Sequence, residues 1–361
     1  MKREVSIYLD AMRFLAAFLV FLDHFSLNRI SGGLGWQLRP FGDEAVTVFF
    51  VLSGFVIAYA TAGREQSPAD YCISRMARIY SVVIPALALT VLLDETGSIL
   101  RPEIYTAANT FVRDLSFTRF ATALTFTNEL WGLSIRQGTN VAYWSLGYEV
   151  PYYVIFGLAL FAPPRWRVLA VCAALLVVGP SVALAYPIWF AGVLAYRYCA
   201  RSTLSPRAGM WLFIAAWIAW LLYEMIVWKF GRPLLPAPWW SKRREILQDC
   251  LIVAFFSIGL IGFNAAAHQL GGILRRFEVP IRWLAGATFT LYICHISVAQ
   301  FLVACMPWPN SDVRSRAIVF AGTLAIVFLV AAVTERKKHV WHRLFTACSR
   351  HVSRLVGPAR A

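Results

Sequence analysis

Charged residues are scarce in this chain. They make up 15% of its 361 residues, whereas hydrophobic residues make up 59%. Soluble globular domains have about 25% charged and roughly 45–50% apolar residues, so this composition shifts toward that of a protein embedded in lipid. Because the apolar runs leave little other sequence, a separate soluble domain of ordinary size is excluded.

The chain also lacks the motifs of several other protein classes. Its seven cysteines form no CxxC and no Cys/His spacing typical of zinc, so we expect no structural disulfide and no metal site. The first apolar run contains Asp10 and Arg13 and has no small-residue cleavage site, so we expect no cleavable signal peptide. The net charge of +15 comes from Lys and Arg in short loops between apolar runs. Such placement is typical of membrane proteins and argues against nucleic-acid binding.

What the chain does have is a series of long apolar runs. Only helices and closed barrels span lipid, and these runs are too long for barrel strands. The sequence therefore predicts an all-α polytopic transmembrane bundle of about ten spans. The runs lie near 7–28, 44–62, 79–95, 141–162, 167–183, 185–199, 209–228, 246–267, 284–306 and 317–334.

Two segments leave alternatives open. The stretch 168–198 has 31 nearly uninterrupted apolar residues, about 46 Å if helical, which exceeds a bilayer core of about 30 Å. A break at Gly179-Pro180 would give two short helices, which we favour, whereas one tilted helix would reduce the count to nine spans. The long connection 96–140 carries an apolar piece at 117–126 that lies on the membrane surface or dips into it.

The distribution of Lys and Arg predicts the orientation. With ten spans, loops on the side of both termini carry more of these residues, although the bias is moderate. We therefore expect a multi-pass protein of the cytoplasmic (inner) membrane with both termini in the cytoplasm. Residues 1–340 form the transmembrane domain, and 341–361 form a short basic cytoplasmic tail.

The first run buries two ionisable residues on one helix face. Arg13 and His24 are 11 positions apart, which is about 20° of rotation after three turns and about 16 Å along the axis. Small side chains between them would leave a shallow groove on that face. Because ionisable groups inside a span are costly, they indicate function by default. The alternative is that Arg13 pairs with Asp10 and that His24 is a packed polar residue.

Other runs contain further candidates. Arg75 and Arg78 stand at the mouth of the third run, where guanidinium groups suit phosphate; the alternative is ordinary positive charge beside a membrane. Glu149 lies inside the fourth run with Ser145 one turn earlier. A buried carboxylate needs a partner, so it would orient His24, bind a sugar hydroxyl or lock helices together.

Two more features are weaker alone. Ser53-Gly54, inside the second run, is typical of close helix packing. His295 lies inside the ninth run, and a single histidine there is more often structural than catalytic.

Taken in order, these pieces resemble the acyltransferase-3 family of membrane-bound acyltransferases over about residues 8–340. Each motif is weak alone, but the order and intervals together are specific. The Pro that often follows the paired arginines closely lies further on here, at Pro85, and the Pro of the family's ExP pattern is missing. The residues that carry the resemblance are Arg13 and His24; Phe49, Phe50, Leu52, Ser53, Gly54 and Phe55; Arg75, Arg78, Ile79 and Tyr80; Trp144, Ser145, Leu146 and Glu149; Leu291, Tyr292 and His295; and Glu335.

The resemblance implies an O-acyltransferase of the stand-alone type, without an SGNH domain. Its donor would be acyl-CoA, commonly acetyl-CoA, used as a co-substrate with no further cofactor. Its acceptor would be a hydroxyl of a carbohydrate or glycolipid. Arg13, with Arg75 and Arg78, would hold the donor; His24 would be general base or transient acyl carrier; and Glu149 would support that site. Direct transfer and an acyl-histidine relay both remain open, as do the acceptor, the acyl group and the oligomeric state.

Two rival functions belong to other classes. A proton-coupled exporter or flippase of a lipid-linked glycan would also use intramembrane His and Glu. Transporters tend to contain two related halves, and none is found in this sequence. A non-catalytic scaffold would not explain why Arg13 and His24 share one face.

Overall fold

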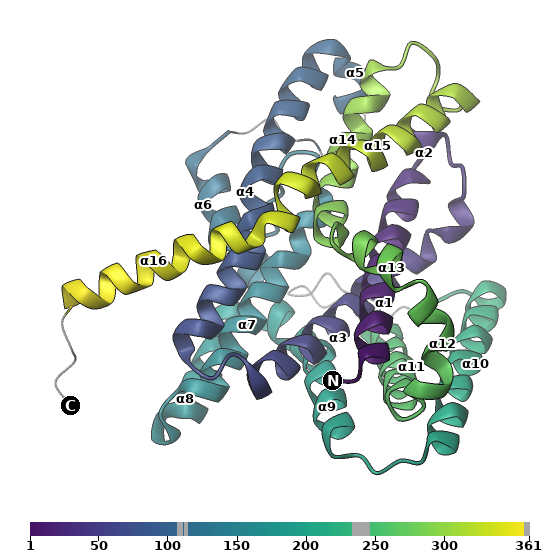
Figure 1. The fold of residues 1–361 in the computed structure, drawn as a ribbon. Helices are drawn as coiled ribbons and strands as arrows, with labels where there is room; N and C mark the ends of the chain where they lie inside the picture. The colour runs from purple at the N-terminus through teal and green to yellow at the C-terminus, as the bar shows by residue number, and fades with distance from the viewer. Residues whose placement is uncertain (107–110, 112–114, 233–245, 357–361) are drawn as a thin grey trace.

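The computed structural model describes residues 1–106, 111, 115–232 and 246–356, with the side chains beyond 351 left out. Within these residues the regular structure is helical, with no strands, and the helices form a bundle (Figure 1). This confirms the all-α class. The end of the expected tail, 357–361, lies outside the described residues.

Ten long helices coincide with the ten apolar runs. Eight helices are long and apolar enough to cross a membrane, whereas α7 and α8 have 16 and 15 residues and fall short of the roughly 20 needed. The chain is therefore a multi-pass membrane protein with eight helices of spanning length and one shorter pair. The ten helices are α1 (Arg3–Phe25), α3 (Pro40–Gly63), α4 (Pro68–Leu100), α7 (Leu146–Phe161), α8 (Pro164–Val178), α9 (Pro180–Arg201), α10 (Pro206–Phe230), α11 (Ile246–Ala265), α14 (Thr288–Cys305) and α15 (Val313–Val333).

The break expected at Gly179-Pro180 is present. Gly179 separates α8 from α9 with φ of 82°, a conformation that favours glycine. Pro180 then begins α9, where its missing N–H does no harm. The stretch 168–198 is therefore two helices.

The remaining elements connect and flank these ten helices. They are α2 (Asn28–Ser31), α5 (Pro102–Thr106), α6 (Phe117–Leu124), α12 (Ala267–Arg276), α13 (Glu278–Ala285) and α16 (Lys338–Val356), with the 3-10 turns η1 (Trp36–Leu38), η2 (Leu130–Gly132), η3 (Val141–Ser145) and η4 (Glu335–Lys337). Helix α16 runs past α4 and projects from the side of the bundle (Figure 1).

Glycines let α3 and α9 approach closely at the centre of the bundle. A Cβ on Gly54 would collide with the carbonyl oxygen of Trp189, and one on Gly192 would collide with that of Val51. Any larger side chain would force the two helices apart. The packing interpretation of Gly54 is therefore supported.

The segment 117–126 reaches into the bundle. The Tyr80 hydroxyl donates to the carbonyl of Leu124 at 2.8 Å, and the Tyr143 hydroxyl donates to that of Ala123 at 2.8 Å. Tyr80 lies 12 residues into the 33-residue α4, about 18 Å from its start. The structure thus fastens the backbone of this segment to α4 and η3, while the side chain of Phe117 stays exposed.

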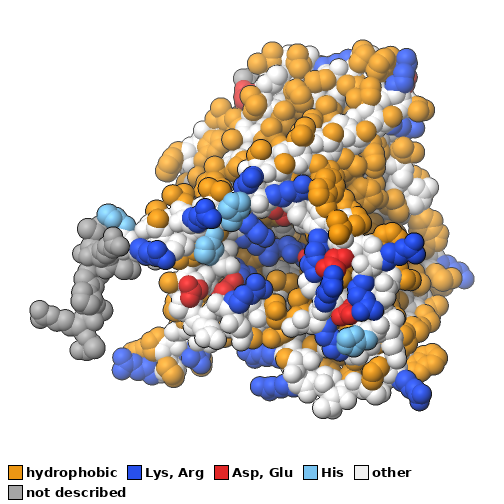
Figure 2. All heavy atoms as spheres, viewed as in Figure 1, with side chains coloured by type: hydrophobic (Ala, Val, Ile, Leu, Met, Phe, Trp, Pro, Cys, Tyr) orange, Lys and Arg blue, Asp and Glu red, His pale blue; other side chains and the backbone are white. Residues whose placement is uncertain are grey.

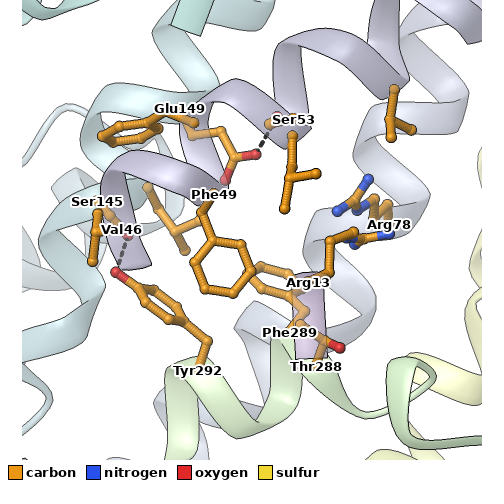
Figure 3. A pocket seen from close by; sticks show the side chains of 14 residues that line it. Arg13, Val46, Phe49, Ser53, Arg78, Ser145, Glu149, Thr288, Phe289 and Tyr292 are labelled. Atoms are coloured by element: carbon orange, nitrogen blue, oxygen red, sulfur yellow. Dashed lines mark hydrogen bonds between the residues drawn. The ribbon is translucent and has the colours of Figure 1, made fainter. Parts of the chain in front are cut away.

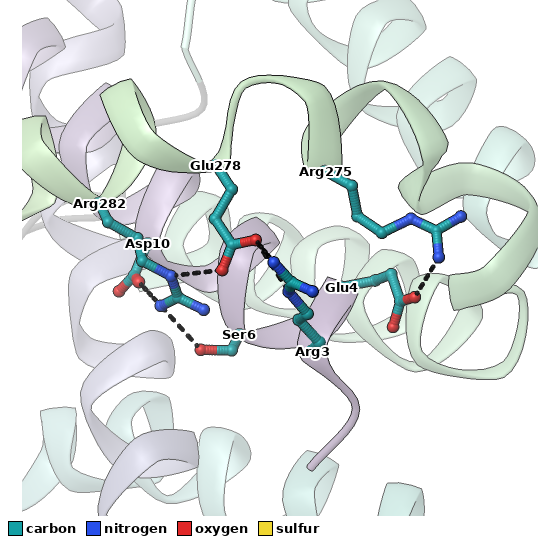
Figure 4. A network of polar contacts seen from close by, with 7 residues as sticks. All are labelled: Arg3, Glu4, Ser6, Asp10, Arg275, Glu278 and Arg282. Atoms are coloured by element: carbon teal, nitrogen blue, oxygen red, sulfur yellow. Dashed lines mark hydrogen bonds and ion pairs between the residues drawn. The ribbon is translucent and has the colours of Figure 1, made fainter.

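The N-terminal half of α1 is fastened by ion pairs to α12 and α13 (Figure 4). We call this group the paired cluster. Each of its arginines meets a carboxylate: Arg3 meets Glu278 at 2.5 Å, Arg282 meets Asp10 and Glu278 at 2.8 Å each, and Arg275 meets Glu4 at 3.3 Å.

Candidate active site

A small pocket lies where α1, α3, α4, α7 and α14 meet (Figure 3). Its volume is about 40 Å³, and Arg13 of α1 and Arg78 of α4 both line it. We call it the cationic pocket. Its other lining residues used below are Phe49, Ser53, Ser145, Glu149, Thr288, Phe289 and Tyr292. Figure 2 shows this face of the molecule hollowed, with Lys and Arg side chains around the hollow.

The two arginines of the pocket have no direct counter-ion. Among the described residues, neither has a carboxylate within 4.0 Å or a hydrogen-bond acceptor. Glu149 and Glu335 act on both arginines electrostatically, but their oxygens are held by neutral donors. Asp10, the alternative partner of Arg13, instead binds Arg282 at 2.8 Å. Two half-buried guanidinium groups are thus left facing a pocket.

Arg75 is placed differently from Arg78. It forms a buried ion pair with Glu65 and lies over the ring of Tyr71 at 5.5 Å. Its side chain does not line the cationic pocket. The structure therefore brings Arg13 and Arg78 together and leaves Arg75 in a separate, paired position.

Glu149 belongs to a hydrogen-bond network that joins three helices. Its Oε1 accepts from the Ser53 hydroxyl at 2.6 Å and from the Tyr153 hydroxyl. The indole N–H of Trp189 donates to Ser53 Oγ at 3.2 Å. The carboxylate faces the cationic pocket but has no bond to His24. It locks α3, α7 and α9 together while carrying a negative charge beside the arginines.

His24 is bonded to the other intramembrane histidine. Its Nδ1 lies 2.8 Å from Nε2 of His295, whose own Nδ1 lies 2.8 Å from the carbonyl oxygen of Leu291. A carbonyl only accepts, so His295 carries its proton on Nδ1 and its Nε2 accepts in turn. The proton between the rings therefore belongs to Nδ1 of His24. In the neutral pair, Nε2 of His24 keeps its lone pair, which is the form that a general base or a nucleophile needs.

His24 opens onto a second cavity, which we call the histidine cavity. Its volume is about 330 Å³, and it lies between α1 and the segment before α7. Its walls combine aromatic rings with polar groups, a lining that suits a sugar with apolar faces and hydroxyls. The residues used below are Glu129, Arg136, Asn140, Tyr143, Trp144 and Tyr148.

The two cavities are separated by packed side chains. The face of α1 between Arg13 and His24 is buried, so the shallow groove expected there is filled. The Tyr292 hydroxyl donates to Ser145 Oγ at 2.8 Å, and the ring of Phe49 packs edge-on against Tyr292 (Figure 3). Trp144, next to Ser145 in the chain, already lines the histidine cavity. The Tyr292–Ser145 bond therefore lies at the wall between them.

Sequence reasoning missed most of the histidine cavity. Glu129, Asn140 and Tyr143 come from an irregular connection whose pattern has no helical or strand period. One signal was available, because this connection concentrates carboxylate and amide side chains in a chain where such groups are scarce. The pairing of His24 with His295 was also missed, because 271 positions separate them.

The fold and this site define a class: a multi-pass membrane protein with a cationic pocket and a histidine pair inside its bundle. A family model described as an acyltransferase domain matches residues 6–335. The chain therefore belongs to the acyltransferase-3 family.

A curated relative and the solved structures were also compared. The exopolysaccharide production protein ExoZ of Rhizobium meliloti (strain 1021) is 29% identical over 145 residues, or 39% of this chain. The chain spans only 43% of the length of that relative in the match. No solved structure matches the fold significantly.

Proposed function

We propose that this protein is an inner-membrane O-acyltransferase that moves an acyl group, commonly acetyl, from acyl-CoA to a hydroxyl of a cell-surface polysaccharide or lipid-linked glycan. The observation that carries the proposal is the pair of sites along α1. An unpaired cationic pocket lies at Arg13, and a histidine with an available Nε2 lies at His24, in a separate polar and aromatic cavity.

The geometry supports a division of labour. Arg13 and Arg78 bind the phosphates of the donor through charge-assisted hydrogen bonds. The acceptor sugar occupies the histidine cavity against Tyr148 and Trp144. The donor's arm passes from one cavity to the other when the Tyr292–Ser145 contact opens. Family membership favours acyl transfer over glycan export, and the similarity to ExoZ, an exopolysaccharide production protein, supports a polysaccharide acceptor.

In the direct route, Nε2 of His24 takes the proton of the acceptor hydroxyl. The oxygen attacks the thioester carbonyl, the C–S bond breaks, and the CoA sulfur leaves with the proton returned by His24. In the relay route, Nε2 attacks the thioester carbonyl, the C–S bond breaks and CoA leaves as the thiolate. The acceptor hydroxyl then attacks the acyl-imidazolium carbonyl, the bond from that carbonyl to Nε2 breaks, and the hydroxyl proton passes to the CoA thiolate. His295 acts as a positioning residue in both, because it fixes the proton of His24 on Nδ1.

The test compares His24→Ala and His295→Asn at matched membrane levels, with acyl transfer to the glycan as the measurement. General acid–base catalysis contributes about 10²–10⁴-fold, so His24→Ala should lose at least about a hundredfold. His295→Asn should lose less and shift the pH profile. Transfer at the wild-type rate by His24→Ala would refute this mechanism. Protein-bound label from radioactive acetyl-CoA without acceptor would distinguish the relay from direct transfer.

We also propose that both termini lie in the cytoplasm. Eight spanning helices, with the α7–α8 pair either crossing or folding back together, give an even number of crossings. Reporter fusions at the two ends should both read cytoplasmic. A periplasmic signal from the C-terminal fusion alone would contradict this topology.

A further inference from the structure

The corner that leads into α16 is fixed to the rim of the cationic pocket. The carboxylate of Glu335 accepts from the backbone N–H of Phe289 at 3.3 Å and of Thr290 at 2.9 Å, and from the Thr290 hydroxyl at 3.0 Å. These bonds hold η4 on the first turn of α14, whose residues Thr288 and Phe289 line the pocket. Lys338, which directly follows η4 in the chain, is therefore held near the residues that line the pocket.

Helix α16 is fixed further along as well. The ring of Phe345 lies 6.2 Å from that of Tyr80 in α4, the helix that also carries Arg78. Lys338 is the first residue of α16 and is thus held between two contacts. Figure 1 shows the helix passing α4 before it projects from the bundle.

Lys338 adds a third cation to the two arginines. Its ammonium group interacts electrostatically with Arg78 and Arg13. The carboxylates of Glu335 and Asp10 also act on it, but among the described residues no carboxylate lies within 4.0 Å of it. It is exposed, whereas both arginines are half-buried, so it lies nearer the mouth. Of its neighbours, Arg336 stacks on Trp283 at 4.5 Å, and Lys337, the last residue of η4, is exposed.

Three cations that repel one another and lack a direct counter-ion form a site for a polyanion. Resting on the function proposed above, we propose that Lys338 binds the 3′-phosphate of CoA while Arg13 and Arg78 bind its diphosphate. The order of groups in the donor supports this assignment. With the thioester directed inward toward His24, the pantetheine arm places the diphosphate next and the ribose 3′-phosphate outermost, where the outermost cation lies.

The test uses the full-length protein in detergent or vesicles and two donors, acetyl-CoA and 3′-dephospho-acetyl-CoA. The variants are Lys338→Gln and Lys338→Arg, with Lys337→Gln as the matched control one position away. The measurements are KM and kcat for each donor, and equilibrium binding of CoA and dephospho-CoA. A hydrogen bond between charged groups is worth about tenfold or more in binding.

Wild-type protein and Lys337→Gln should bind acetyl-CoA about tenfold better than the dephospho donor. Lys338→Gln should raise the KM for acetyl-CoA about tenfold, leave that for the dephospho donor unchanged, and keep kcat. Lys338→Arg should restore most of the discrimination. The inference is overturned if the wild type does not discriminate, or if Lys338→Gln discriminates as well as the wild type. A wild-type protein that uses neither donor would instead overturn the proposed function.

Discussion

Two groups of cations lie near the N-terminal half of α1, and they differ in whether their arginines are paired with carboxylates. In the paired cluster, every arginine meets a carboxylate, as Arg282 does at Asp10 and at Glu278 (Figure 4). In the cationic pocket, Arg13 and Arg78 face a cavity, and no carboxylate among the described residues lies within 4.0 Å of either guanidinium group (Figure 3). The first arrangement fastens helices, whereas the second leaves charge available for a ligand.

The difference between the two groups is informative because carboxylates that could pair with the pocket arginines lie nearby. Asp10 is three residues from Arg13 but binds Arg282. Glu335 is engaged by backbone N–H groups and a hydroxyl, and Glu149 by two hydroxyls. Exposed pairs contribute about 0–1 kcal/mol, while unpaired charge near lipid is costly. Substitutions in the two groups should therefore have different consequences. Those in the cationic pocket should reduce function, whereas those in the paired cluster should slightly reduce stability.

The largest effect in this comparison is expected from Arg13→Gln. Removing a half-buried phosphate ligand costs roughly 2–5 kcal/mol, so kcat/KM for acyl-CoA should fall about a hundredfold. Arg13→Lys should recover only part, because an ammonium lacks the planar fork. Arg282→Gln is the control and should leave donor use nearly unchanged. Equal losses from both variants would abolish the distinction between the two groups.

A carboxylate introduced into the pocket should convert it into a paired cluster. Thr288 lines the pocket at the start of α14, where an acidic residue is compatible with the helix. Thr288→Asp should raise the KM for acyl-CoA at least about tenfold, because the new charge competes with phosphate for the arginines. Thr288→Asn has the same shape and no charge, and should bind the donor normally. Matching KM values for these two variants would argue against an electrostatic site.

Glu149→Gln should have a smaller effect than Arg13→Gln or Thr288→Asp, and it should strengthen donor binding rather than weaken it. The amide oxygen still accepts from Ser53 and Tyr153, so the hydrogen-bond network is retained, while one negative charge beside the arginines is removed. The KM for acyl-CoA should fall by roughly two- to fivefold. A loss of kcat of more than about tenfold would show that the carboxylate itself works on the acceptor or on His24.

The smallest effect is expected in the paired cluster, from Glu278→Gln. Hydrogen bonds from Arg3 and Arg282 hold the pKa of the Glu278 carboxyl below its usual value. The carboxylate therefore adds stability above the unfolded-state pKa of about 4.3, and this stability is lost as the pH falls through the lower folded-state pKa. Thermal unfolding should show a slightly less stable variant at neutral pH and no difference under strongly acidic conditions. Reduced donor use at neutral pH would contradict a purely structural role.

The ten apolar runs predicted the ten long helices, and Gly179-Pro180 predicted the break between α8 and α9. The sequence also points to Arg13, Arg78 and His24, because ionisable groups stand out in apolar runs, and the structure places all three beside cavities. The prediction did not separate Arg75 from Arg78. Their three-residue spacing does not tell which of them faces a carboxylate and which faces a cavity.

The sequence by itself determined where helices form and which of them bury charge, because hydropathy and helical period are local properties of the chain. Only the tertiary structure decided the partners. It gave Asp10 to Arg282 rather than to Arg13, joined His24 to His295 across 271 positions, and brought Lys338 within electrostatic reach of Arg78 and Arg13. Hydrogen bonds and ion pairs form at about 3 Å, and the packing of distant helices decides which groups come that close.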